Sequence, residues 1–298
     1  MCWVKRFFLL FLISVASNTF ADSPAWVLYE RGARLAAENR PDEALVLFRA
    51  AISRRGPFPE AESAIGDIFR GESSFDLAVR QYNRALEYAS AFTVPDDHFS
   101  VRYKLAEVYE TVRDFRAYES TLRAITDLDP AFIGPAAASM RENYRTTITT
   151  RGFDQLARLY RIDDGFSWRA HSELGVFYVD TGRYEQALSH LIFSTLMIIT
   201  PVVEEIRRVD LDYEYTTLSA LVRDIDRFST LSRFAARREL YKNLYYLANG
   251  LYGVVGWRDH IRSLWTAVST APDAGVWAIR ASAQLRDPRL EIRIDGVR

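Results

Sequence analysis

The sequence predicts an all-α protein made of successive antiparallel helix pairs. Two observations carry this prediction: small and aromatic side chains recur at a spacing of 34 residues near the N-terminus, and apolar residues keep helical spacing elsewhere, for instance over 211–235. Of the 298 residues, 49% are hydrophobic and 26% charged, which is ordinary for a folded globular chain. With 38 Lys and Arg against 39 Asp and Glu, the net charge of −1 argues against a polybasic nucleic-acid binder and against an acidic tail.

The first 21 residues have the features of a secretory signal peptide. Lys5 and Arg6 precede an apolar run over 7–16, and small residues stand before a cleavage position after Ala21. This run is too short to cross a bilayer, which needs roughly 20 residues, and no later segment is expected to approach a membrane span. We therefore expect an exported, most simply periplasmic, protein with no integral span after cleavage. A signal-anchored membrane protein is the alternative.

Cysteine usage limits the chemistry of the mature chain. The single cysteine, Cys2, lies in the leader and would be lost on cleavage. A mature chain without cysteine has no disulfide, no thiolate nucleophile and no thiolate metal site. We expect no metal and no cofactor.

Three segments share one pattern of small and bulky residues. Gly32 and Phe48 of the first copy align with Gly66 and Tyr82 of the second, 34 residues later, and a third copy has Gly175 in the same place. The pattern resembles the tetratricopeptide repeat, a 34-residue helix–turn–helix unit whose small residues let two helices approach closely. The resemblance implies a right-handed superhelix of about five or six antiparallel helix pairs, closed by a C-terminal capping helix.

The turn inside each pair should contain a residue that lets the chain leave the first helix. Gly182 meets this requirement in the third copy, while Asn39 and Ser73 stand there in the first two. Near the C-terminus, 273–285 is expected to form the capping helix. Residues 290–294 alternate like a short strand, which must borrow a sheet edge or remain extended.

These features divide the chain into six expected parts. They are a signal peptide over 1–21, tetratricopeptide-like repeats over 22–130, a degenerate helical pair over 131–167, a further repeat over 168–208, packing helices over 209–240, and a last repeat-like unit with the capping helix and a short tail over 241–298.

The resemblance also implies which residues face a concave groove. Tyr29, Tyr103 and Glu107 fall at groove positions of the N-terminal repeats, and Tyr245 and Tyr252 at groove positions of the last unit. Rigid aromatic side chains there suit the binding of a peptide or of a hydrophobic ligand. For Tyr245 and Tyr252 the alternative is core packing beneath the cap.

The groove positions exclude one mode of binding known for the family. Some chaperone-binding members hold a peptide's terminal carboxylate with lysine and asparagine, where this sequence has Ser63 with Asp67 and Tyr103 with Glu107. Acidic side chains would repel a terminal carboxylate.

Two further clusters have ordinary structural interpretations. His171 and His190 are expected to face each other on paired helices, and packing is favoured over a two-histidine metal site because no carboxylate has ligand-like spacing. Asp210, Asp212 and Glu214 lack the glycine and distal glutamate of a calcium loop, so they indicate the entry to a helix.

The sequence therefore favours a non-enzymatic interaction scaffold in the bacterial cell envelope, which binds a protein or peptide partner in the groove. One alternative is an accessory protein of an envelope transport system that binds a small hydrophobic ligand. A second is a helical-repeat enzyme acting on the cell wall, which lacks support because the sequence has no paired catalytic motif.

Overall fold

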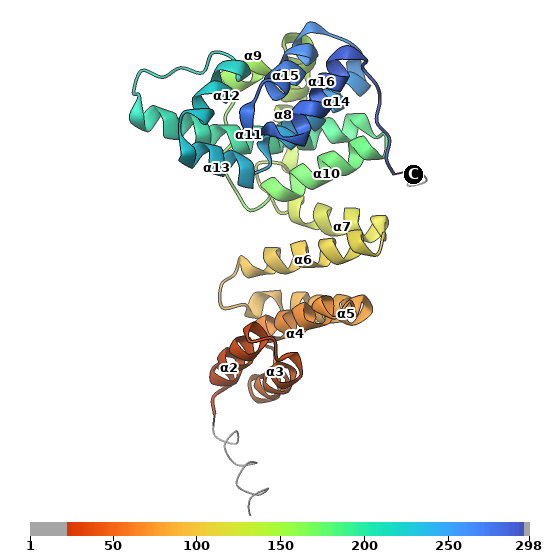
Figure 1. Ribbon diagram of the computed structural model, residues 1–298. Helices are drawn as coiled ribbons and strands as arrows, with labels where there is room; N and C mark the ends of the chain where they lie inside the picture. Colours follow the sequence, from red (N-terminus) through yellow and green to blue (C-terminus); the bar gives the residue numbers. More distant parts are fainter. Residues whose placement is uncertain (1–22, 295–298) are drawn as a thin grey trace, which may run out of the picture. The chain divides into compact units, whose positions relative to one another are not determined.

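The computed structural model describes residues 23–294, and within that range every regular element is helical (Figure 1). It contains fifteen α-helices, α2 to α16, two short 3-10 helices and no strand in this range. The all-α prediction is therefore confirmed, whereas the expected signal peptide lies outside the described residues. The described residues divide into two compact units, unit 1 up to Tyr118 and unit 2 from Glu119, at a boundary inside helix α7 (Phe115–Thr126).

Unit 1 consists of short helices of similar length that pack as hairpins, α2 against α3 and α4 against α5. Its helices are α2 (Ala25–Ala37), α3 (Pro41–Arg55), α4 (Pro59–Gly71), α5 (Phe75–Glu87), the 3-10 helix η1 (Ala89–Ala91) and α6 (Asp97–Thr111). A Cβ atom on Gly32 would lie 2.8 Å from the Phe48 ring, and one on Gly66 would lie 2.6 Å from the Tyr82 ring. The recurring glycine is thus needed because the ring of the paired helix occupies the space of a side chain.

One turn geometry ends four of the helices. Asn39, Ser73 and Arg113 each have φ of 59°, and Gly182 has φ of 75°, which is the left-handed region. In each turn the next amide donates to the carbonyl five residues earlier, at 2.7–2.9 Å. This is the hydrogen-bond pattern of the Schellman motif, which satisfies carbonyls at a helix end. The structure confirms the turn positions predicted at residues 39, 73 and 182.

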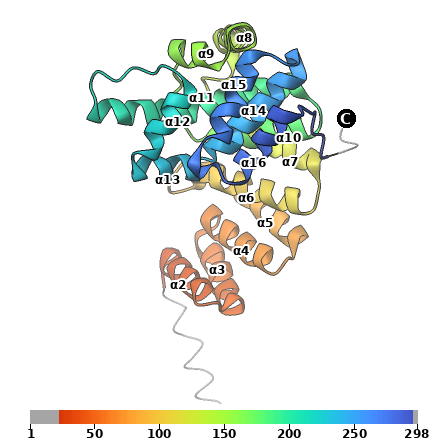
Figure 2. The same cartoon turned by 45° about the horizontal axis from the view of Figure 1, so that its top comes forward.

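Unit 2 is organised around one long helix, with α10 and α14 packed against α11 (Figure 2). After the end of α7 its helices are α8 (Gly134–Arg151), α9 (Phe153–Leu159), α10 (Trp168–Asp180), α11 (Tyr184–Val209), α12 (Leu218–Asp226), α13 (Ser229–Arg237), α14 (Leu240–Val255), α15 (Asp259–Ser269), the 3-10 helix η2 (Pro272–Ala274) and α16 (Val276–Arg286). A Cβ on Gly175 would lie 2.4 Å from Leu191, and one on Gly253 would lie 2.3 Å from Tyr184. Glycines thus allow α10 and α14 to approach α11 closely.

Helix α11 corrects the expectation that no segment after the leader approaches a membrane span. Its 26 residues and mean hydropathy of 1.6 in the most apolar window are sufficient for a span by length and composition alone. However, 83% of that window is buried inside the structure, as in the core helix of a folded domain. The apolar surface of α11 is covered by the helices of unit 2.

The prediction of a helix entry at Asp210, Asp212 and Glu214 is wrong. Helix α11 continues to Val209, and these acidic residues lie in the connection that follows it. The next helix begins only at Leu218, where the hydroxyl of Thr217 accepts a hydrogen bond from the Ala220 amide at 3.2 Å. A threonine N-cap therefore sets the helix start, not the acidic residues upstream.

The described residues after α16, 287–294, remain extended and form no strand. The capping helix predicted at 273–285 corresponds to α16, which spans Val276–Arg286 and packs against α15 and α14. Beyond it, the amides of Arg293 and Ile294 both donate to the carbonyl of Asp180 at the end of α10, at 2.9 and 3.0 Å. Of the two outcomes expected for 290–294, the extended one is observed.

Candidate functional site

Unit 1 carries two adjoining hollows of about 530 and about 210 Å³ on one face. Both are lined by Tyr29, Ala64 and Asp67, so they form one continuous surface, which we call the groove face. The larger hollow also has Ala33, Ala36, Asn39, Pro41, Phe48, Ile68, Gly71 and Glu72, and the smaller has Glu60, Ser63, Phe92, Asp97, Ser100, Val101 and Lys104. Helices α2, α4 and α6 thus contribute to the same face.

Tyr29 lies where the two hollows meet. Its ring centroid is 5.7 Å from that of Phe48 and 5.2 Å from that of Phe58, in tilted arrangements that fix the ring. Partial burial, together with the carboxylate of Glu60, raises the pKa of Tyr29, so its hydroxyl stays protonated and can donate a hydrogen bond. The structure therefore places this predicted site residue on the groove face as a rigid aromatic group with a polar tip.

Asp67 connects the charged residues of α4 and α6. Its Oδ1 accepts from the Tyr82 hydroxyl at 2.8 Å and its Oδ2 accepts from Lys104 Nζ at 2.7 Å. One helical turn further, Arg70 donates to Glu107 Oε2 at 2.6 Å. These side chains are roughly one-third exposed, and ion pairs of this kind contribute little to stability. Their main effect is to hold the charges at fixed places on the surface.

The two predicted site residues on α6, Tyr103 and Glu107, lie outside both hollows. Both side chains are partly buried. Glu107 is paired with Arg70 rather than fully solvated. Sequence reasoning missed Lys104, which follows Tyr103 and reaches the smaller hollow. Lysine occurs only at Lys5, Lys104 and Lys242, and that scarcity was the available signal.

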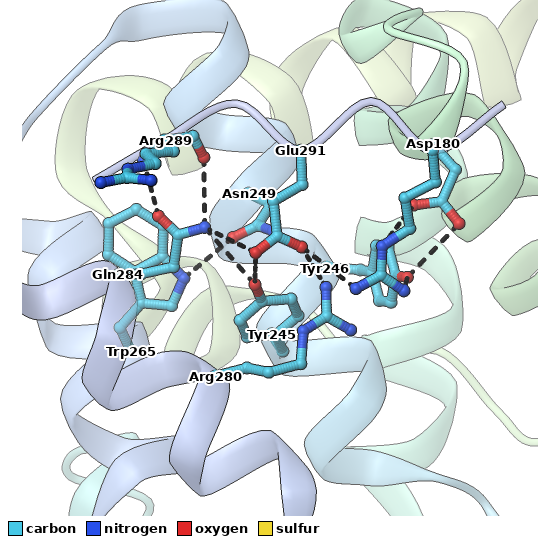
Figure 3. A network of polar contacts seen from close by, with 10 residues as sticks. Asp180, Tyr245, Tyr246, Asn249, Trp265, Arg280, Gln284, Arg289 and Glu291 are labelled. Atoms are coloured by element: carbon cyan, nitrogen blue, oxygen red, sulfur yellow. Dashed lines mark hydrogen bonds and ion pairs between the residues drawn. The ribbon is translucent and has the colours of Figure 1, made fainter. Parts of the chain in front are cut away.

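The second predicted patch, at Tyr245 and Tyr252, is covered in the structure. Tyr245 is 0% exposed, and its hydroxyl donates to Glu291 Oε1 at 2.8 Å (Figure 3). Tyr252 packs its ring 5.7 Å from that of Trp265 and donates to the carbonyl of Pro288. Of the two interpretations given for this patch, Tyr245 therefore shows core packing beneath the C-terminal segment, whereas Tyr252 is half-buried beside it.

His171 and His190 do face each other, with their Nδ1 atoms 2.9 Å apart. Both are buried and pack against Phe132, and His171 also packs against Phe193. Burial, reinforced by the neighbouring histidine, lowers the pKa of His171 well below its usual value, and burial lowers the pKa of His190 to about 3. Two neutral rings can share one proton between the Nδ1 atoms, so the pair forms an interhelical hydrogen bond inside unit 2. Among the described residues, no group of three or more His, Cys, Asp or Glu could hold a metal ion.

Unit 2 has a hollow of its own, of about 590 Å³, beside α8 and α11. Most of its lining is apolar, and the few polar groups lie in the segments before α8 and α10. The lining residues are Asp129, Pro130, Ala131, Ala136, Ala137, Met140, Tyr144, Arg161, Ile162, Asp163, Asp164, Gly165, Phe166, Phe193 and Met197.

Comparison with known proteins shows two similar chains from spirochetes and no matching family model. A protein of Treponema pallidum (strain Nichols) is 25% identical over 197 residues, which is 65% of this chain and 53% of that protein. A protein of Borreliella burgdorferi (strain B31) is 19% identical over an alignment of 314 residues, covering 94% of this chain and 95% of that protein. The chain thus matches about half the length of the Treponema protein. Both are described as uncharacterized, so an assignment of function depends on the site itself.

Proposed function

We propose that this protein is a non-enzymatic interaction scaffold that holds a segment of a partner protein on the groove face of unit 1. The observation that carries the proposal is that the two hollows adjoin across the alternate helices α2, α4 and α6, with Tyr29 and Asp67 on both. A fixed aromatic anchor surrounded by charged groups is the usual arrangement of an energetically important interface site.

We further propose that the hairpins are divergent tetratricopeptide-like repeats. Support comes from the glycine that lies beneath a ring or a leucine of the partner helix at Gly32, Gly66 and Gly175, and from the shared turn geometry at residues 39, 73, 113 and 182. Both features are the packing requirements of such repeats, and a face lined by the first helix of each pair is where that family binds partners.

The chemistry of the groove face favours a partner segment with an apolar side chain next to basic ones. Ala33, Phe48 and Ile68 provide an apolar wall in the larger hollow, whereas Glu60, Glu72 and Asp97 join Asp67 along the two hollows. Lys104 is the only cation among the lining residues, and it is already paired with Asp67. Lysine or arginine of the partner would therefore be attracted, while a terminal carboxylate would be repelled.

We propose that the scaffold acts outside the cytoplasm, in the cell envelope. Lys5, Arg6 and the apolar run over 7–16 support export, with cleavage after Ala21. N-terminal sequencing of the protein from its native host should begin at Asp22. Retention of Met1 in the membrane fraction would instead indicate a signal anchor.

Site-specific photo-crosslinking in cells tests the location of the partner. A photoreactive amino acid is placed at Ala33 or Ser100 on the groove face, and at Arg80 as a control, because Arg80 is exposed on α5 and lines neither hollow. We expect Ala33 and Ser100 to give an adduct with the same protein, and Asp67→Arg to reduce it. Equal adducts from Arg80, or adducts from Arg80 alone, would contradict the proposal.

The mostly apolar hollow of unit 2 favours one second candidate, a small hydrophobic ligand. Its volume of about 590 Å³ lies in the range of small-molecule pockets. Native mass spectrometry of protein purified from its host would reveal a bound molecule, and Ala137→Trp should remove it. If the measured mass equals that of the chain alone and the purified protein binds no apolar dye at this site, this candidate is eliminated.

A further inference from the structure

Residues 288–294 contact a row of polar side chains from α14, α16 and the end of α10, which we call the polar surface (Figure 3). The side chain of Gln284 is 3% exposed and contacts both backbone groups of Arg289. Its Oε1 accepts from the Arg289 amide at 2.8 Å, and its Nε2 donates to the Arg289 carbonyl at 3.1 Å. A side-chain amide that contacts the N–H and the C=O of one residue binds an extended backbone as a neighbouring β-strand does. Such a contact does not depend on which side chain the bound residue has.

The carboxylate of Glu291 is the most specific contact of the segment. Its Oε1 accepts from the Tyr245 hydroxyl at 2.8 Å and from Gln284 Nε2 at 3.2 Å, while Oε2 pairs with Arg280. The Arg280 guanidinium lies over the Tyr245 ring at 4.3 Å, which fixes its direction. Charge-assisted hydrogen bonds from a fixed arginine and a tyrosine select a carboxylate over a neutral side chain.

The segment is held mainly by polar contacts, with Pro288 and Ile294 half-buried. Leu290 and Ile292 remain 52% and 53% exposed, so little apolar surface is removed from water. Beyond Glu291, the amides of Arg293 and Ile294 reach the Asp180 carbonyl. Because core burial contributes little to this attachment, the docked segment can be released while the helices beneath it keep their own packing.

We infer that this polar surface is a peptide-binding site for an extended segment with a glutamate side chain, and that residues 288–294 occupy it as an intramolecular ligand. Helix α16 ends at Arg286, immediately before the segment, so the tether is very short and the effective concentration of the segment is high. A partner segment of the same chemistry displaces it. The site is thereby kept closed until such a partner is present in sufficient local concentration. This inference is independent of the groove face of unit 1.

Truncation after Asp287 tests the inference with a defined probe. The probe is a fluorescent peptide with the sequence of residues 288–294, and a second peptide has glutamine in place of Glu291. We expect the truncated chain to bind the first peptide at least about tenfold more tightly than the full chain does. The glutamine peptide should bind the truncated chain about tenfold more weakly, since it loses a charge-assisted contact. Arg280→Gln in the truncated chain should produce the same loss, and Arg262→Gln, exposed on α15, should not.

A second variant covers the case in which the truncated chain does not fold. Arg289→Pro in the full chain removes the backbone N–H that donates to Gln284 Oε1. It changes no residue within a helix. Hydrogen exchange should then show faster exchange at 290–294, together with new binding of the peptide. A folded truncated or Arg289→Pro protein that binds no peptide, or binds both peptides equally, would overturn the inference and leave the segment a structural strap.

Discussion

The two units share one packing rule within their helix hairpins but differ in whether the tyrosines at predicted groove positions are accessible. In both, a glycine on the first helix lies beneath a bulky side chain of its partner, Gly66 beneath Tyr82 in unit 1 and Gly175 beneath Leu191 in unit 2. Yet unit 1 presents Tyr29 at the junction of two open hollows, whereas Tyr245 of unit 2 is 0% exposed. The rule specifies how two helices of a hairpin meet. It does not specify what covers the hairpin from outside.

The difference arises from the length and hydropathy of α11. With 26 residues it is much longer than the helices of unit 1, and nearly all of its middle portion is buried. Covering such a helix requires apolar surface on several sides, which α8, α10 and α14 supply. Helix α14 is consequently apolar on most of its surface and carries aromatic residues into the interior. Unit 1 has no comparable element among its described residues.

Acidification should distinguish the units most strongly, because unit 2 contains the buried histidine pair. The folded pKa values of His171 and His190 both lie below the ordinary value of 6.5, so below that pH the unfolded chain binds more protons than the folded chain does. The free energy of unfolding is therefore highest above pH 6.5 and falls as the pH drops below that value, by roughly 1 kcal/mol per pH unit for each histidine. Arg123 and Arg141 oppose protonation, and Asp129, 3.9 Å from His171, is the nearby carboxylate.

Urea unfolding between pH 7.5 and pH 4.5 measures this dependence. Tryptophan fluorescence reports chiefly on unit 2, which contains Trp168, Trp257, Trp265 and Trp277. His190→Gln should reduce the dependence of the unfolding free energy on pH, because only one histidine of the pair then remains. A stability that does not change across this range in the wild-type protein would show that the pair is not neutral in the folded state.

Overpacking the glycine contact tests whether the shared rule is correct. Gly66→Val places carbon atoms where the Tyr82 ring lies, with the first already 2.6 Å away, and should cost about 3 kcal/mol of unfolding free energy. Gly71→Ala is the matched control on the same helix, since nothing lies within 4 Å of a Cβ there. Denaturant titration of both variants would contradict the proposed register if Gly66→Val were as stable as Gly71→Ala.

Substitutions in the hairpin turns should have smaller effects on stability, and of opposite sign in the two units. Unit 1 uses Ser73 at φ of 59°, where unit 2 uses Gly182 at φ of 75°. Ser73→Gly should stabilise the protein by up to about 1 kcal/mol, and Gly182→Ala should destabilise it by a similar amount, because residues with a Cβ are strained in this region. Thermal melts that moved in the same direction for both variants would be inconsistent with this explanation.

Contacts set by neighbouring helices could be predicted from the sequence, and contacts made across the fold could not. The Gly66–Tyr82 pair lies within one hairpin, so a 34-residue repeat was enough to locate it, as it was for Tyr29 on the groove face. Glu291 contacts Tyr245 from 46 residues away, and Lys104 contacts Asp67 from 37 residues away. No periodic pattern encodes which polar residue will meet which across such a separation. The covered state of Tyr245 therefore appears only in the structure.

The central claim is that the groove face of unit 1 binds a partner, and the affinity of the crosslinked partner for Tyr29→Ala tests it most directly. Loss of a rigid anchor should weaken binding by about 2 kcal/mol, or roughly 30-fold, while Arg80→Ala should bind as the wild-type protein does. Melting temperatures are measured alongside, because Tyr29 also packs against Phe48 and Phe58. A folded Tyr29→Ala protein with wild-type affinity, together with a weakened Arg80→Ala protein, would place the partner on the opposite face and contradict the account.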